Sequence, residues 1–166
     1  MSAEIVDDKV MLKDQSLVSK LYEKGFGKLV NNGLELSLLE ALFLLERDSI
    51  TISKNDKALT PEDILKRVDE DEFMLRYRVF KDLRERGYIA KSGFKFGAHF
   101  RVYKRGEYEN AHSVYLVHAV KEGDTLSFSE LSRAIRLSQS VKKDMIFAVV
   151  DDEGDVTYYS VDRITP

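Results

Sequence analysis

The chain has 166 residues, 43% of them hydrophobic and 33% charged, with a formal net charge of −3, two prolines and no cysteine. This length can bury a core, and no apolar run approaches the roughly 18–20 residues that a membrane span needs. Composition excludes a disulfide scaffold and a cysteine-ligated zinc site, and we expect a soluble, cytoplasmic protein without a signal peptide or a bound metal.

The first half of the sequence predicts a mixed α/β region. A strand is expected around Glu4–Leu12 and a helix near Gln15–Lys24, and GFGKLVNNG supplies glycines and asparagines for a loop. Ser37, with Glu40 three residues later, forms a capping box at the start of LLEALFLLERD. The nearly continuous apolar run after this cap predicts a well-buried helix.

A short strand and two helices are expected next. ITI predicts the strand, and Thr60, followed by Pro61 and two acids, predicts a helix start. Another helix is expected to begin near Asp71 and to end at Gly87. We place a domain boundary near the end of this helix, between residues 84 and 85.

Strands dominate the second half of the sequence. YIAK and FKFGAHFRVY are expected to be neighbouring strands, and SVYLVHAV is a β-branched run typical of a buried strand. Nearer the C-terminus, MIFAVV and VTYYSVDRI flank DDEGD, which predicts a hairpin.

One helix interrupts these strands. Ser127 and Glu130 form a capping box that opens a helix extending to about Ser138. The fold class is therefore α+β, with two small mixed α/β domains at residues 1–84 and 85–166. The second domain is expected to hold a central mixed or antiparallel sheet flanked by helices.

Basic residues are concentrated in one segment. Between Arg76 and His112 there are ten Lys and Arg and four acids, a local charge of +6 that leaves −9 for the remaining residues. Aromatic side chains are interleaved with these charges, a combination that attracts phosphate and offers stacking surfaces. A solvated helix face followed by half-buried strands explains the same composition.

Three reactive side chains lie in the C-terminal half: Tyr103, His112 and Lys143. A phenol, an imidazole and an ammonium group suffice to cleave RNA by internal attack, because the 2′-hydroxyl loses a proton, the leaving 5′-oxygen gains one and the phosphorus carries extra negative charge. Each residue alone is more often structural. His99 and His118 are weaker candidates, and His118 alternates with apolar residues on one strand face.

The motifs around these residues resemble a known family. KSGFKFGAHFRVY, HSVYLV and RLSQSVKKDMIFAVVDDEGDVTYY follow one another between Lys91 and Tyr159. In order and spacing they are similar to the archaeal tRNA-splicing endonuclease, the tRNA-intron lyase. YEKGFGKLVNNGLELSLLEALFLL resembles the N-terminal domain of that family. The resemblance implies an assembly domain at residues 1–84 and a catalytic endonuclease domain at residues 85–166.

The resemblance also implies catalytic roles. Tyr103 would act as general base on the 2′-hydroxyl, His112 as general acid to the leaving 5′-oxygen, and Lys143 would balance charge on the phosphate. A phenol is a weak base at neutral pH, so this role requires positive charge nearby. The family motif selects Lys143 over Lys142, and strand alternation would turn Lys142 toward solvent.

Further residues are implied in assembly and RNA binding. The acidic hairpin does not fit an EF-hand, because Gly154 is the fourth residue from Asp151. A solvated turn is the simple interpretation, whereas the resemblance implies docking into a basic groove of another subunit. Arg136 and Arg163 match arginines that clamp a bulge nucleotide. The acidic residues of the hairpin are Asp151, Asp152, Glu153 and Asp155.

These features together predict an RNA endonuclease that excises introns from precursor tRNA at a bulge-helix-bulge, without metal or other cofactor. It would leave 2′,3′-cyclic phosphate and 5′-hydroxyl ends. A homotetramer, built as a dimer of dimers, is the first expectation for assembly, and the catalytic subunit of a heterotetramer is the second.

A non-catalytic protein is the main alternative. TPEDILKRV, DEFMLRYRVFKDLRERG and two strands follow the order of a winged-helix-like nucleic-acid-binding module. This alternative accounts for the basic segment but leaves HSVYLV, Lys143 and the acidic hairpin unexplained. A non-catalytic subunit of the same endonuclease is disfavoured, because it would be expected to lack part of the trio.

Overall fold

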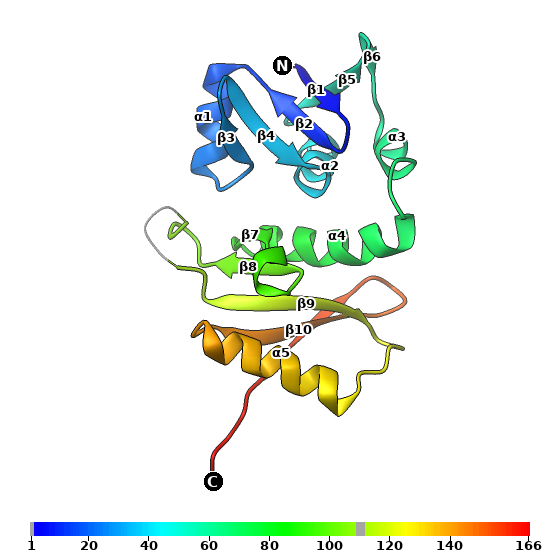
Figure 1. Ribbon diagram of the computed structural model, residues 1–166. Coiled ribbons are helices and arrows are strands. Elements are labelled where there is room, and N and C mark those ends of the chain that lie inside the picture. Colours follow the sequence, from blue (N-terminus) through cyan, green and yellow to red (C-terminus); the bar gives the residue numbers. More distant parts are fainter. Residues whose placement is uncertain (1, 109–111) are drawn as a thin grey trace. The chain divides into compact units, whose positions relative to one another are not determined.

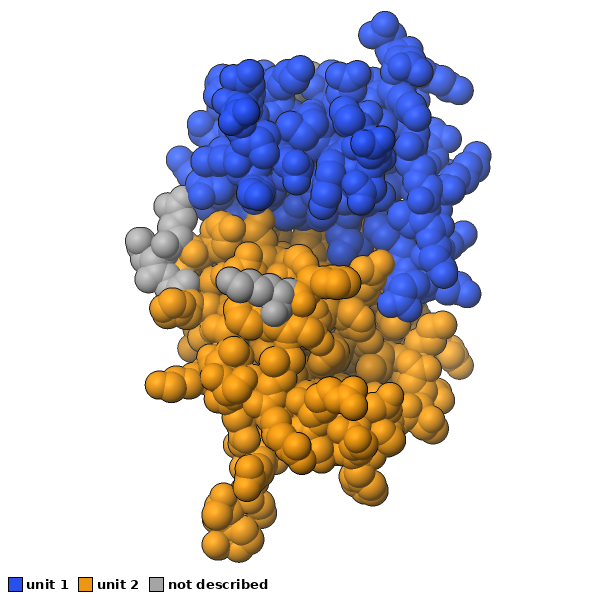
Figure 2. Space-filling model, in the orientation of Figure 1, with its two compact units in different colours: residues 1–73 blue, residues 74–166 orange. Residues whose placement is uncertain are grey.

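The computed structural model describes residues 2–108 and 112–166. The chain forms two compact units, residues 1–73 and 74–166, which are drawn in different colours in Figure 2. The division falls near the start of helix α4 (Glu70–Glu85), whereas the sequence placed the domain boundary near the end of the same helix. The expected fold class, α+β with two small mixed domains, is confirmed.

Unit 1 contains a six-stranded sheet in the order β3-β4-β2-β1-β5-β6, with helices α1 and α2 among its connections (Figure 1). Glu4–Leu12, expected as one strand, is a hairpin of two antiparallel strands, because Asp7 adopts a φ of +55° and turns the chain. GFGKLVNNG, expected as a loop, contains β3 and the start of β4. The elements are β1 (Ser2–Val6), β2 (Lys9–Leu12), α1 (Gln15–Glu23), β3 (Lys28–Val30), β4 (Gly33–Ser37), α2 (Leu38–Glu46), β5 (Thr51–Lys54), β6 (Lys57–Ala58) and α3 (Pro61–Leu65).

Capping residues begin the helices as the sequence predicts. The backbone N–H of Glu40 donates to Ser37 Oγ at 3.2 Å, and the N–H of Ser37 donates to Glu40 Oε2 at 3.0 Å. Glu40 is buried, and its other carboxylate oxygen accepts from the N–H of Gly27 at 3.0 Å. The capping carboxylate therefore also fixes the chain just before β3. The same reciprocal pattern opens α3 at Thr60 and α5 at Ser127.

Unit 2 is a five-stranded mixed sheet in the order β11-β10-β9-β8-β7. β9 and β10 are parallel and are joined by α5, while the other neighbouring strands are antiparallel. FKFGAHFRVY is a strand only in its last four residues, because the backbone turns at Gly97 with a φ of +71°. The elements after α4 are β7 (Ile89–Ser92), the 3-10 turn η1 (Phe94–Phe96), β8 (Phe100–Tyr103), β9 (Tyr115–Lys121), α5 (Phe128–Ser140), β10 (Asp144–Val150) and β11 (Val156–Val161).

Helices cover both faces of this sheet. On one face, the rings of Phe80 in α4 and Phe100 in β8 lie 6.2 Å apart. On the other face, Leu131 and Leu137 of α5 pack against a buried cluster that includes Leu116 and Met145. Among the described residues, no helix has the length and apolar character needed to span a membrane.

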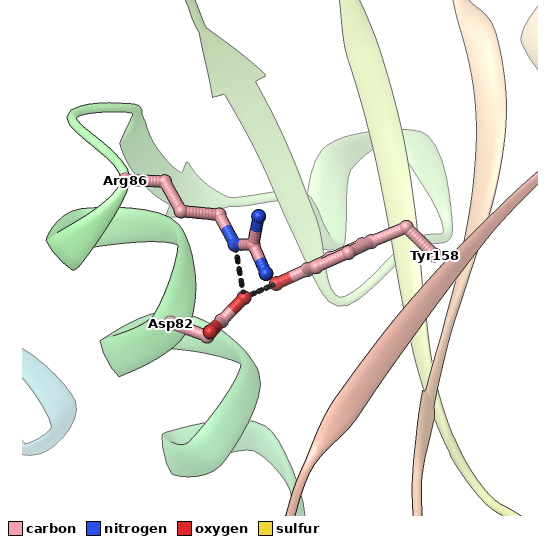
Figure 3. Close-up of polar contacts among 3 residues, drawn as sticks. All are labelled: Asp82, Arg86 and Tyr158. Atoms are coloured by element: carbon pink, nitrogen blue, oxygen red, sulfur yellow. Dashed lines mark hydrogen bonds and ion pairs between the residues drawn. The ribbon is translucent and has the colours of Figure 1, made fainter.

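Helix α4 is tied to the last hairpin of the chain through a hydrogen-bonded trio (Figure 3). Tyr158 Oη donates to Asp82 Oδ2 at 2.6 Å, and Arg86 Nε donates to the same oxygen at 2.7 Å. Burial, followed by the hydrogen bond to the Asp82 carboxylate, raises the pKa of Tyr158. One turn earlier, the Arg78 guanidinium lies against Gly154, where a β-carbon would collide with it. α4 therefore fixes both the tip and the outgoing strand of the hairpin.

Tyr158→Phe should lower the free energy of unfolding by about 1–2 kcal/mol, because it removes a hydrogen bond to a carboxylate that is partly buried. The matched control is Tyr159→Phe on the next residue of β11, whose side chain is 54% exposed. Urea unfolding of the two variants measures the difference. An equal effect of both changes would contradict the role given to the Asp82 hydrogen bond.

Candidate active site

Strand register brings three chain segments to one edge of the sheet in unit 2. β8 runs antiparallel to β9, and β9 runs parallel to β10, so the end of β8 lies beside the starts of the other two strands. Val114 joins all three, because its N–H donates to Val102 O at 2.9 Å and its carbonyl accepts from the Asp144 N–H at 3.1 Å. Tyr103, Ser113 and Lys143, the next residues outward, are therefore neighbours.

Tyr103 is the buried last residue of β8. Arg101 lies two residues earlier on the same strand face, and its Nη1 donates to Tyr103 Oη at 3.0 Å. The ring of Tyr108 meets the Tyr103 ring edge-on at 5.1 Å, and Lys91 Nζ lies 5.1 Å from the centre of the Tyr108 ring. The phenol oxygen is thus bonded directly to a cation.

Arg101 was not predicted from the sequence as a site residue. The sequence feature that could have identified Arg101 is the period of a strand, which puts residues two apart on the same face. Because a phenol requires nearby positive charge to act as a base, that period combined with the chemistry assigned to Tyr103 points to Arg101.

Lys143 is half-buried just before β10. Its Nζ donates to the carbonyl of Ser113 at 2.9 Å and lies 5.6 Å from the centre of the Phe96 ring. Burial, followed by the positive charge of Arg101, lowers the pKa of Lys143. The ammonium group and the guanidinium therefore act on each other, which links Lys143 electrostatically to the Arg101–Tyr103 pair.

A helix C-cap, and not strand alternation, positions Lys143. Helix α5 ends at Ser140, and the N–H groups of Lys142 and Lys143 donate to the carbonyls of Gln139 and Ser138 at 3.1 and 2.9 Å. These two bonds form a Schellman motif, in which Lys142 occupies the left-handed position with a φ of +56°. Lys142 is exposed as expected, but the reason given for it was wrong, because neither lysine belongs to a strand.

His112 precedes the carbonyl that Lys143 binds, and its side chain is exposed to solvent. Residues 109–111, which lead into it, lie outside the described residues. The structure therefore places Tyr103, Arg101 and Lys143 at one edge of the sheet, and His112 lies next to Ser113 at the same edge.

His99 and His118 lie at the opposite end of the β8–β9 pairing. His99 Nδ1 accepts from the N–H of Ala119 at 2.8 Å, which continues the ladder beyond the last backbone pair, Phe100 with Val117. The ring of His118 lies 5.6 Å from that of His99, and burial, followed by the charge of His99, lowers the pKa of His118 to about 4. Both imidazoles pack against the strands, at the end of the β8–β9 pairing that lies opposite Tyr103.

Arg136 and Arg163 are both exposed, Arg136 on α5 and Arg163 beyond β11. Among the described residues, no hydrogen bond or ion pair joins either arginine to Tyr103, His112 or Lys143. In the acidic hairpin, Asp151 Oδ1 accepts from the N–H groups of Glu153 and Asp155, both at 2.9 Å, and so braces the turn. The side chains of Asp152, Glu153 and Asp155 are exposed.

Comparison with known proteins identifies the family. A model of the tRNA intron endonuclease N-terminal domain matches residues 1–65, and a model of the catalytic C-terminal domain matches residues 73–158. The chain belongs to the tRNA intron endonuclease family. It is an enzyme of that family and carries both domains, so the non-catalytic winged-helix-like alternative is set aside.

Relatives match over nearly their whole length. The tRNA-splicing endonuclease of Methanothermobacter thermautotrophicus is 39% identical over 168 positions, which cover 100% of this chain and 99% of the relative. That of Thermococcus gammatolerans is 46% identical over 160 positions, covering 95% of this chain and 94% of the relative. That of Pyrococcus furiosus is 41% identical over 159 positions, covering 93% and 91%.

Proposed function

We propose that this enzyme excises introns from precursor tRNA by cutting at a bulge-helix-bulge, without metal, and leaves 2′,3′-cyclic phosphate and 5′-hydroxyl ends. One observation carries the proposal. Three groups meet at one sheet edge of the family's catalytic domain. They are a phenol hydrogen-bonded to a guanidinium, a half-buried ammonium group and the residue after His112. These groups match the three needs of internal attack by a 2′-hydroxyl.

The bond changes follow from these groups. Tyr103 Oη, with its negative charge stabilised by Arg101, accepts the proton of the 2′-hydroxyl. The freed 2′-oxygen forms a bond to phosphorus as the bond from phosphorus to the 5′-oxygen breaks. His112 donates a proton to that leaving oxygen, so the products are a cyclic phosphate and a 5′-hydroxyl.

Lys143 and Arg101 stabilise the phosphate in the transition state. Both are cations, and the positive charge of Arg101 contributes to the lowered pKa of Lys143. A phosphate that gains negative charge relieves this repulsion, and a preorganised cation at such a site contributes several kcal/mol. The hydrogen bond from Lys143 to Ser113 also orients the chain that carries His112.

Recognition of the RNA is assigned to exposed arginines. We propose that Arg136 and Arg163 clamp a bulge nucleotide between their guanidinium planes, because RNA is commonly read through splayed bases and guanidinium groups stack on them. Both side chains are free to reach a nucleic acid, since both are exposed.

Cleavage of an intron-containing precursor tRNA tests the proposal. The purified enzyme in excess EDTA should release the intron at the rate seen with Mg²⁺, because protein side chains supply the acid, the base and the charge. Analysis of the end groups should find 2′,3′-cyclic phosphate. Complete dependence on added Mg²⁺, or a 3′-hydroxyl product, would overturn the metal-free mechanism.

The acidic hairpin is proposed to dock on another subunit within a homotetramer, a dimer of dimers, with the catalytic subunit of a heterotetramer as the alternative. We assign the N-terminal domain to assembly. Arg78 and the Asp82–Tyr158 hydrogen bond hold the hairpin against α4, and its three exposed acids therefore project in a fixed arrangement. Three negative charges at one turn favour a basic partner surface.

Light scattering tests the docking role of the hairpin. Replacing Asp152, Glu153 and Asp155 together by their amides should reduce the mass from about four chains, because the charge attraction is lost. Asp151 is left unchanged, since it braces the turn. The control neutralises three exposed acids elsewhere, namely Glu4, Glu23 and Glu122. An unaltered tetramer in the hairpin variant would remove the docking role.

A further inference from the structure

Helix α5 carries a groove, lined by polar and apolar groups alike, on the side turned away from the sheet. The cavity volume of the groove is about 430 Å³, within the roughly 300–1,000 Å³ typical of ligand sites. Leu131, Ala134 and Leu137 pack on the sheet from other positions of the helix. The groove is lined by Phe128, Ser129, Ser132, Arg133 and Arg136.

The groove combines groups that complement a nucleotide chain. Phe128 is 86% exposed and offers a free ring face, while Arg133 and Arg136 place two cations three residues apart. Like charges at this spacing destabilise an isolated helix, and the attraction of Arg133 to Glu130, three residues earlier, offsets part of this repulsion. Bases stack on aromatic rings, and guanidinium groups and serine hydroxyls bind phosphate and sugar oxygens.

The lining contains no acid, which favours a polyanion. The acid that lies nearest along the chain, Glu130, is held in the capping box, where its Oε2 accepts from the Ser127 N–H at 2.9 Å. A second copy of the chain would bring a protein surface to the groove, whereas an exposed ring beside two guanidinium groups is the arrangement of single-strand RNA sites.

Position along α5 connects the groove to Lys143. At a rise of about 1.5 Å per residue, Arg136 lies about 6 Å and Phe128 about 18 Å before Ser140, the last residue of the helix, and Lys143 follows three residues later. An RNA strand with its scissile phosphate at Lys143 would pass around the C-terminal end of α5 to reach the groove. We infer that α5 binds the single-stranded part of the RNA substrate that flanks the cut, with Phe128 stacking on a base and Arg133 binding a phosphate.

This inference rests on the proposed function for the identity of the RNA, but Phe128 and Arg133 lie outside the catalytic trio. Their replacement should weaken binding and leave the saturated single-turnover rate unchanged. A defect in the trio would do the reverse, because the trio acts on the reacting atoms.

A tryptophan at the groove gives a direct readout. The chain has no tryptophan, so Phe128→Trp introduces a single indole. The probe is a bulge-helix-bulge RNA with 2′-deoxynucleotides at the cut positions, which cannot be cleaved by internal attack. Binding should quench the indole fluorescence with the Kd measured by anisotropy of labelled RNA. Leu29→Trp, a half-exposed position in unit 1, is the control and should not respond.

Two substitutions measure the energetic contribution. Phe128→Leu keeps an apolar side chain but cannot stack, and should weaken binding roughly tenfold, whereas Phe128→Tyr should restore it. Arg133→Gln should reduce the slope of log Kd against log salt by about 0.7–0.9, the effect of one lost phosphate contact. Arg67→Gln, an exposed arginine of unit 1, is the control.

The outcomes separate this inference from the proposed function. If the wild-type enzyme cuts in EDTA while the indole of Phe128→Trp stays unquenched and Phe128→Leu binds normally, the groove is not an RNA site. If that indole is quenched and Phe128→Leu binds weakly while the all-ribose RNA stays uncut, the groove stands and the cleavage proposal fails. A lower oligomer mass for Phe128→Leu without RNA, with no quenching, assigns the groove to subunit contact and overturns the inference.

Discussion

The whole candidate site depends on the hydrogen bonds of Val114. This residue is bonded to Val102 on one side and to Asp144 on the other, so it closes the antiparallel β8–β9 ladder and the parallel β9–β10 ladder at the same place. A shift of one residue in either register would turn Tyr103 to the other face of the sheet or move Lys143 along its edge. Tyr103 and Lys143, 40 residues apart in the chain, therefore reach the same edge of the sheet through the pairing of β8, β9 and β10.

Electrostatics then gives this edge its chemistry. Arg101 binds the phenol oxygen of Tyr103, and its charge contributes to the lowered pKa of Lys143. Two cations at one edge, one of them half-buried, favour the binding of a phosphate. The same unit fixes its acidic hairpin through α4, so one small domain carries the candidate site and the surface proposed for assembly.

Local chemistry made much of this fold predictable. The capping boxes at Ser37 and Ser127 identified two helix starts, since their reciprocal hydrogen bonds are local in sequence. The errors arose where one backbone angle decides the outcome. Asp7 and Gly97 adopt positive φ and break expected strands, and Lys142 does so where glycine is usual. Arg101 was not predicted, although its bond to Tyr103 spans only two residues of one strand, because the period of the strand was not combined with the positive charge that a phenol base requires.

The single-turnover cleavage rate of Arg101→Gln tests the central claim most directly, with Arg105→Gln, an exposed arginine two residues beyond Tyr103, as the control. If the guanidinium makes the phenol a base, the variant should cut about 100-fold more slowly at neutral pH with RNA still bound. An unchanged rate would contradict the account.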